Sequence, residues 1–235
     1  MQFAVDANGE RVLPSPKAKA VCPGCGAPVI AKCGEIVMWH WSHLTKDCDP
    51  WYEPESVWHR QWKEHFPENW REVVIGKHRA DIKTPHGVVE FQASSIGSTE
   101  VKERENFYGK MIWVVKADMF DLEARLSPNA YSFYRTLYRK SRGFWPGGGN
   151  LFDLLNENLH QEVQSTDAIW DRSWLRDPMY RWRRPRTTWG FAKKKIYLDI
   201  GDEDELFSVT WMSPDCKIIK GMPLGKKEFI SKLLA

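Results

Sequence analysis

Two acids and an amide lie close together in the segment HRADIKTPHGVVEFQASS (78–95). Asp81 precedes the turn signal PHG, and Glu90 and Gln92 follow it. Alternation along a strand puts Glu90 and Gln92 on one face, and antiparallel pairing across the turn would bring Asp81 near Glu90. Two carboxylates and a neighbouring backbone carbonyl suit Mg²⁺ or Mn²⁺, although acids on hairpin strands are more often simply solvated.

A helical segment just before these acids carries three further reactive side chains. Glu55, His59 and Lys63 are spaced four residues apart, so they share one face of a helix. They offer a metal ligand, a proton shuttle and a phosphate contact, although the same spacing is typical of an ordinary polar helix face. Arg104 and Tyr108 form another such pair further along and are candidates for holding a phosphate of DNA.

Cysteine and histidine pairs near the start of the chain predict a structural zinc site. Two C-x2-C or H-x2-H pairs supply the four nitrogen and sulfur ligands of a closed tetrahedral site. Cys48 is the first reserve ligand, and Cys33 is the other cysteine that can replace a histidine. The predicted ligands are Cys22, Cys25, His40 and His43.

A basic and aromatic segment, MYRWRRPRTTWGFAKKK (179–195), is a candidate DNA-binding strip. Cations neutralise phosphates and aromatic rings stack on bases, so Trp182 and Trp189 are possible stacking surfaces. The alternative is a solvated basic loop that buried tryptophans anchor. The predicted DNA contacts in this segment are Arg181, Arg183, Arg184 and Arg186.

The elements that position these residues can be read from periodicity and turn signals. Segments 54–66 and 98–110 favour helices, and 227–235 favours a short terminal helix. The order of elements predicts a mixed sheet covered by helices. The predicted strands are 71–76, 78–84, 88–94, 111–117, 196–201 and 206–212.

The bulk composition is that of an ordinary globular protein and leaves DNA binding to local patches. The chain has 235 residues and a net charge of only +3, so no overall basic field announces a nucleic acid. No apolar run suits a signal peptide or a membrane span, and five cysteines fit a metal site better than disulfides, which together predict a cytoplasmic protein. The expected regions are 1–50, 51–142 and 143–235, the last beginning at the GFWPGGGN break.

The ordered set of motifs in the middle of the chain resembles the PD-(D/E)XK nuclease superfamily, and more closely the competence protein CoiA-like nucleases. This resemblance implies a restriction-endonuclease-like α/β fold and metal-dependent cleavage of DNA phosphodiesters. CoiA-like proteins often begin with a CPxC…HxxH element, which this chain also has. The segments that carry the resemblance are ESVWHRQWK (55–63), HRADI (78–82), EFQASSI (90–96), RENFY (104–108) and MIWVV (111–115).

The resemblance also assigns roles by position. Asp81 and Glu90 would hold the divalent ion, with Glu55 as an additional ligand and Glu72 as another candidate acid. In-line attack of water on phosphorus would follow.

One position departs from the superfamily pattern. Gln92 occupies the place of the superfamily's lysine, although the CoiA-like pattern itself carries EFQ. An amide can orient water but cannot supply a positive charge, so we expect Lys63 to supply it from the helix, with Lys63 or Arg104 offsetting charge on the phosphate oxygens.

Two other classes of function compete with a nuclease that has DNA as its partner. A nuclease fold without turnover would be a nucleic-acid-binding module, and a zinc-ribbon adaptor would bind other proteins of DNA processing. The set of Asp81, Glu90 and Gln92 argues against the first. The adaptor leaves these acids and the helix of Glu55 unexplained.

Overall fold

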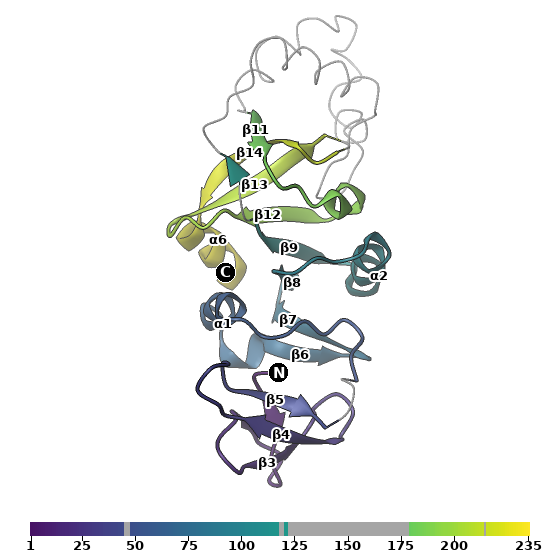
Figure 1. Cartoon of the computed structure of the whole chain (residues 1–235), viewed down its shortest axis with the longest axis vertical. Helices are drawn as coiled ribbons and strands as arrows, with labels where there is room; N and C mark the ends of the chain where they lie inside the picture. Colours follow the sequence, from purple (N-terminus) through teal and green to yellow (C-terminus); the bar gives the residue numbers. More distant parts are fainter. Residues whose placement is uncertain (45–47, 118–119, 122–178, 214) are drawn as a thin grey trace, which may run out of the picture. The chain divides into compact units, whose positions relative to one another are not determined.

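The computed structural model describes residues 1–44, 48–117, 120–121, 179–213 and 215–235 (Figure 1). Its contacts form two compact units, one of Met1–Phe91 with Leu234 and one of Gln92–Leu233 with Ala235. The predicted division at residues 50 and 142 stays a prediction. The GFWPGGGN break lies outside the described residues, as does YRTLYRKSR (134–142), a second segment that is basic in sequence.

A small antiparallel sheet forms the start of the first unit and is drawn in purple and blue in Figure 1. Its strands are β1 (Ala4–Val5), β2 (Arg11–Val12), β3 (Lys19–Val21), β4 (Pro28–Lys32) and β5 (His40–His43), in the order β2-β1-β3-β4-β5. The strands are short, which limits the apolar surface that this small element can bury. A compact core of six buried residues holds them together. That core consists of Met1, Ala4, Ala20, Cys22, Val29 and Trp41.

Helix α1 (Val57–Glu64) follows and begins later than the predicted residue 54. Ser56 is its N-cap, because the Ser56 hydroxyl accepts the amide of His59 at 3.3 Å. A 3₁₀ turn (Glu68–Trp70) then leads into three antiparallel strands, β6 (Arg71–Ile75), β7 (His78–Thr84) and β8 (Gly87–Gln92). The turn between β7 and β8 is the predicted PHG turn, where Thr84 pairs with Gly87.

The second unit contains the remaining strands and helices. It holds α2 (Ser98–Tyr108), β9 (Met111–Lys116), β10 (Phe120–Asp121), β11 (Met179–Trp182), a 3₁₀ helix (Thr187–Phe191), β12 (Lys195–Asp199), β13 (Glu205–Met212), β14 (Ile218–Gly225) and α6 (Lys226–Leu234). Strand β12 runs parallel to β9, and β13, β14, β11 and β10 continue antiparallel.

The chain is thus a mixed α/β protein, as predicted, and it has few helices among its described residues. Strand β9 is nearly all buried, which explains its continuous apolar sequence. No helix in the described part of the chain is long and apolar enough to cross a membrane.

Candidate metal centre and acidic site

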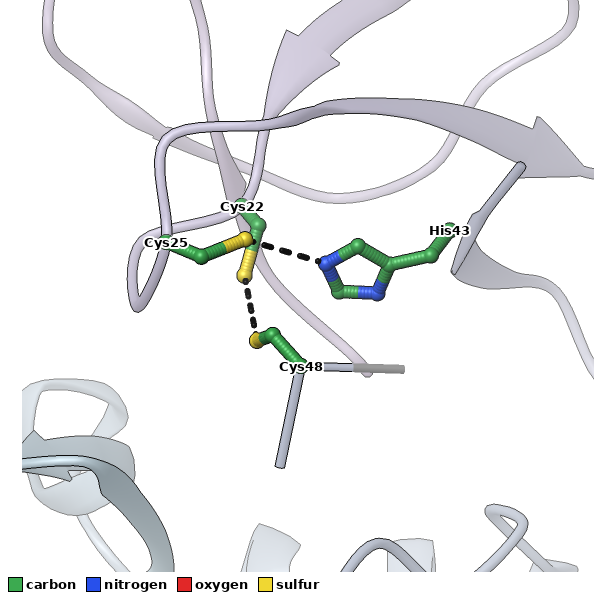
Figure 2. Close-up of side chains that lie close together, drawn as sticks. All are labelled: Cys22, Cys25, His43 and Cys48. Carbon is green, nitrogen blue, oxygen red and sulfur yellow. Dashed lines mark hydrogen bonds between the residues drawn. The ribbon is translucent and has the colours of Figure 1, made fainter. Parts of the chain in front are cut away.

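Four metal-binding side chains converge next to the small N-terminal sheet (Figure 2). Cys22 and Cys25 come from the knuckle that joins β3 to β4, where the amide of Gly26 donates to the carbonyl of Cys22. His43 is the last residue of β5, and Cys48 comes from the chain that follows it. The ligand atoms of these four residues all lie within 4.8 Å of one another.

The distances within this Cys/His centre fit tetrahedral zinc. Zn–S bonds of about 2.3 Å and Zn–N bonds of about 2.0–2.1 Å place two sulfurs about 3.8 Å apart, and a sulfur and a nitrogen about 3.6 Å apart. The Cys22 and Cys48 sulfurs are 3.7 Å apart, and the Cys25 sulfur is 3.4 Å from Nε2 of His43. Three thiols and one imidazole therefore have both the chemistry and the spacing of a closed zinc site.

The fourth ligand differs from the predicted set, because Cys48 lies where His40 was expected. His40 and His43 both belong to β5, and residues three apart on a strand point to opposite faces. His40 instead has its Nδ1 2.8 Å from the carbonyl of Met38. In a helix, the H-x2-H spacing would place both rings on one side. In a strand, the same spacing places them on opposite faces.

The thiols show why this centre favours a cation. A hydrogen bond from the backbone at Ala27 and another from His43 lower the pKa of Cys25 to about 7. Burial and the neighbouring thiols of Cys25 and Cys22 raise the pKa of Cys48 to about 12. Negative charge on Cys25 and Cys22 thus opposes the ionisation of Cys48. A bound divalent cation would remove this opposition, since zinc is held by thiolates.

The predicted acids meet across the β7–β8 hairpin. The carboxylate of Glu90 accepts the backbone amide of Asp81 at 3.2 Å, and that of Asp81 accepts the amide of Phe91 at 2.9 Å. The regular pairing of the hairpin reaches from Thr84 as far as Ile82 on β7. Beyond Ile82, the carboxylates of Asp81 and Glu90 accept hydrogen bonds from backbone amides of the opposite strand. Both acids are therefore held in place by the hairpin itself.

Lys63 lies at the centre of the neighbouring carboxylates and is 1% exposed. Its ammonium donates to Glu55 at 2.7 Å and to Glu72 at 2.9 Å, and lies 3.8 Å from Asp81. Burial alone would lower the pKa of Lys63, but Glu72, Glu55 and Asp81 outweigh it and raise the pKa above 10.5. The helix of Lys63 thus brings a fixed positive charge to the predicted metal-binding acid.

Glu72 connects Lys63 to the N-terminal sheet. One carboxylate oxygen accepts from Lys63, and the other accepts the amides of Gln2 at 2.7 Å and Phe3 at 3.3 Å. Lys63 and other positive groups hold the pKa of Glu72 well below 4.5 despite the opposing effect of burial. Glu72 also has a φ of 48°, a left-handed backbone that costs about 1–2 kcal/mol in a non-glycine residue.

His59 and Glu55 do not lie open as separate catalytic groups. His59 is buried, with Nδ1 2.8 Å from the hydroxyl of Ser56 and Nε2 3.2 Å from the carbonyl of Phe91 and 3.4 Å from Glu53. Burial opposes the imidazolium, but Glu53 and Asp81 raise the pKa of His59 above 6.5. Glu53 is a partner that no sequence pattern predicted, since no periodic spacing links it to His59.

Gln92 ends β8 and shares its face with Glu90. Its amide nitrogen lies 3.3 Å from the carbonyl of Ser94. Its oxygen is buried and has no hydrogen-bond partner among the described residues. A buried amide oxygen normally has a partner, so this atom is suited to accept from water or to bind a cation.

These residues fit a divalent oxygen-binding cation only at the Asp81 end of the cluster. Among the described residues, three acidic, histidine or cysteine ligands come within 4.8 Å only in the Cys/His centre. Glu55, the predicted additional ligand, and Glu72 are occupied by Lys63. The Asp81 side chain is 23% exposed, against 6% for Glu55, so solvent and ligands reach Asp81.

The predicted phosphate pair of α2 is divided. Arg104 is buried, and its Nε donates to Glu100 at 3.0 Å. Its guanidinium also lies over the ring of Trp113. Tyr108 is half-buried at the last residue of α2. A buried guanidinium that an acid already neutralises is poorly placed to bind a phosphate of DNA, so this prediction finds no support for Arg104.

Most arginines of the basic segment are exposed, whereas its tryptophans are buried. Trp182 and Trp189 are buried in the second unit, which removes them as stacking surfaces for bases. Arg186 is half-buried and donates to the carbonyl of Ser94 at 2.9 Å. Arg183 and Arg181 are exposed. The exposed arginines of this segment also include Arg184.

Residues 13–50 match the family described as Competence protein CoiA, N-terminal domain. The match includes all four residues of the Cys/His centre, so the chain carries a CoiA-like N-terminal element built around that centre. No curated protein and no solved structure gave a significant match to the chain.

Proposed function

We propose that the protein is a metal-dependent DNA nuclease with a structural zinc centre. The observation that supports it best is the set of Asp81, Glu90 and Lys63, in which both acids are fixed by the hairpin and a buried ammonium lies 3.8 Å from Asp81. Carboxylates that are oriented by backbone amides and lie beside a buried ammonium are typical of functional sites, where the charges of side chains are arranged for chemistry.

In this proposal Asp81 and Glu90 hold Mg²⁺ or Mn²⁺. The ion, when bound, supplies a Lewis acid for the phosphate and activates water. Lys63 positions the oxygens of Asp81 from behind and does not reach the substrate, because its side chain is 2% exposed. The buried oxygen of Gln92 accepts a hydrogen bond from water on the same face of β8 as Glu90.

DNA is the proposed substrate because cations are exposed elsewhere on the chain. Arg181, Arg183 and Arg184 extend into solvent from β11 and the loop after it, where each can neutralise a phosphate. The similarity of residues 13–50 to a competence protein supports a role in DNA uptake, recombination or mobile-element processing.

The zinc of this proposal is structural, because Cys22, Cys25, His43 and Cys48 leave no open position in a tetrahedral site. It would stabilise the short strands of the N-terminal sheet, whose own core is small.

The test is cleavage of plasmid and labelled single-stranded DNA with Mg²⁺ or Mn²⁺. We expect Asp81→Asn and Glu90→Gln each to lower kcat about 10²–10³-fold, the size of effect of removing one fixed electrostatic group. The matched control is Glu103→Gln, which removes an exposed acid of α2 and should cleave like the wild type.

A non-catalytic DNA-binding module is the second candidate. The neutralisation of Glu55 and Glu72 by Lys63 favours it, since this part of the site is complete without a metal ion. A folded, zinc-loaded wild type that binds DNA but does not cleave it under any of these conditions would establish this alternative and contradict the nuclease.

A further inference from the structure

The chain that leaves the Cys/His centre is fastened at once to β7. Asp49 follows the ligand Cys48 and is only 5% exposed. One oxygen of its carboxylate lies 2.8 Å from Nδ1 of His78, and the other accepts the backbone amide of Arg79 at 2.8 Å. An ionised carboxylate only accepts hydrogen bonds, so Nδ1 of His78 carries the proton in this contact.

Two further contacts of the same segment keep this arrangement rigid. The amide of Trp51 donates to Asp49 at 3.0 Å, which closes a tight turn. The ring of Trp51 stacks on the ring of His78, with centroids 3.2 Å apart and planes within 6°. Asp49, Trp51, His78 and the amide of Arg79 are called the Asp49 clamp below.

The clamp holds the first residue of the strand that carries the candidate acid. His78 is the first residue of β7, and Asp81 lies three residues further along the same strand. At about 3.3 Å per residue, the clamp is about 10 Å from the backbone of Asp81. Because β7 pairs with β6 on one side and β8 on the other, a shift of its first residues also shifts the hairpin of Asp81 and Glu90.

We propose that Asp49 is a positioning residue that couples metal occupancy of the Cys/His centre to the placement of β7 and so of Asp81. The inference rests on the zinc part of the proposed function but not on cleavage of DNA. Cys48 is a ligand and Asp49 its immediate neighbour, so a metal that fixes Cys48 also fixes the backbone that presents the carboxylate to β7.

Coupling of this kind is reciprocal. If bound zinc strengthens the clamp, an intact clamp must strengthen zinc binding by the same factor. A clamp that only supports the fold would protect β7 without changing the affinity for zinc. Zinc affinity therefore separates a positioning role for Asp49 from a merely structural one.

The experiment compares Asp49→Asn with Asp6→Asn in the full chain. Asp6 also accepts backbone amides, those of Asn8 and Glu10, in the same small sheet, but its contacts do not reach β7. Zinc affinity is measured by competition with a chelating dye, and amide hydrogen exchange is measured by mass spectrometry on peptides that cover residues 76–84.

We expect Asp49→Asn to weaken zinc binding about tenfold, within the usual range of coupling between sites. Exchange in β7 should rise in this variant with zinc present, and in the wild type when zinc is removed. Asp6→Asn should match the wild type in both measurements. His78→Asn removes the partner on β7 instead and should produce the same two effects. It provides the test if Asp49→Asn does not fold.

Unchanged zinc affinity in a folded clamp variant would overturn the coupling, even if β7 exchanged faster. Unchanged exchange of β7 in folded, zinc-free wild type would overturn it as well. A wild type that binds no zinc would overturn both the zinc proposal and the coupling. None of these measurements involves DNA, so a failure of the nuclease proposal would leave the coupling standing.

Discussion

The Cys/His centre and the acidic site answer the same electrostatic problem in opposite ways. In the first, three thiols and one imidazole gather with no lysine or arginine among them, and the thiols of Cys25 and Cys22 oppose the ionisation of Cys48. In the second, Lys63 already lies between Glu55 and Glu72. A cluster suited to hold a metal ion thus lies in the same compact unit as a site that carries its own positive charge.

The two sites differ in where the compensating positive charge comes from. In the proposed function the Cys/His centre would gain stability from a bound zinc ion, so its strength would depend on metal supply and pH. The acidic site keeps its geometry without any ion, so Asp81 is already fixed before the divalent cation of the proposed function would bind. Preorganisation of this kind lowers the cost of binding that metal.

The strongest way to break the comparison is Lys63→Met. This variant leaves Glu55 and Glu72 buried without their cation, and we expect a loss of about 3–5 kcal/mol in the free energy of unfolding. Urea denaturation of zinc-loaded protein measures it. Lys232→Met, which breaks the exposed pair with Glu228, should unfold like the wild type. A loss below about 1 kcal/mol in Lys63→Met would show that the acids do not need Lys63.

The identity of the fourth zinc ligand sharpens the other side of the comparison. Structural zinc sites are worth about 10–16 kcal/mol over four ligands, so removing one should cost about 3 kcal/mol, or about 100-fold in affinity. We expect Cys48→Ser to show this loss in a competition assay with a chelator. His40→Ala should bind zinc like the wild type, because His40 lies outside the cluster. Unchanged zinc binding in Cys48→Ser together with a loss in His40→Ala would instead identify His40 as the fourth ligand.

The smallest expected effect concerns pH. The pKa of Glu72 is lower in the folded chain than its ordinary 4.5, so its ionised form stabilises the fold. This stability is fully present above pH 4.5 and is lost as the pH falls through the folded pKa. Glu72→Gln should therefore flatten the decline of unfolding free energy below pH 4.5, measured by urea titration at matched zinc loading. An unchanged slope would contradict the assignment of this charge to Glu72.

Local patterns predicted the strands and helices that carry the acids. The strand predicted at 78–84 is β7 without change, and the helix predicted at 98–110 ends two residues early at Tyr108. Alternation and a PHG turn suffice there, because a hairpin depends on neighbouring residues. The same alternation correctly placed Glu90 opposite Asp81.

Contacts between distant segments were not predictable in the same way. The sequence predicted that Lys63 brings a positive charge from its helix, but not that Glu72 and Asp81 reach it from strands of their own. The expected pair of His40 and His43 did not take into account that both residues lie on one strand, where side chains three residues apart point to opposite faces.

Burial of side chains was the other feature that the sequence left open. Trp182 and Trp189 were candidates for stacking on bases because they alternate with arginines, yet both are buried. A tryptophan in a basic segment covers apolar surface as readily as it binds a base. Only the packing of the second unit decides between these two uses.

The parallel pairing of β12 with β9 has a consequence for how the chain folds. Lys195 lies beside Ile112, so this contact closes a loop of about 80 residues. The pairs β6–β7 and β7–β8 close loops of only a few residues. Folding rates fall as contacts become less local, so we expect the hairpin of Asp81 to form early and the sheet of the second unit to complete late. During synthesis, the hairpin would therefore form well before β12 leaves the ribosome.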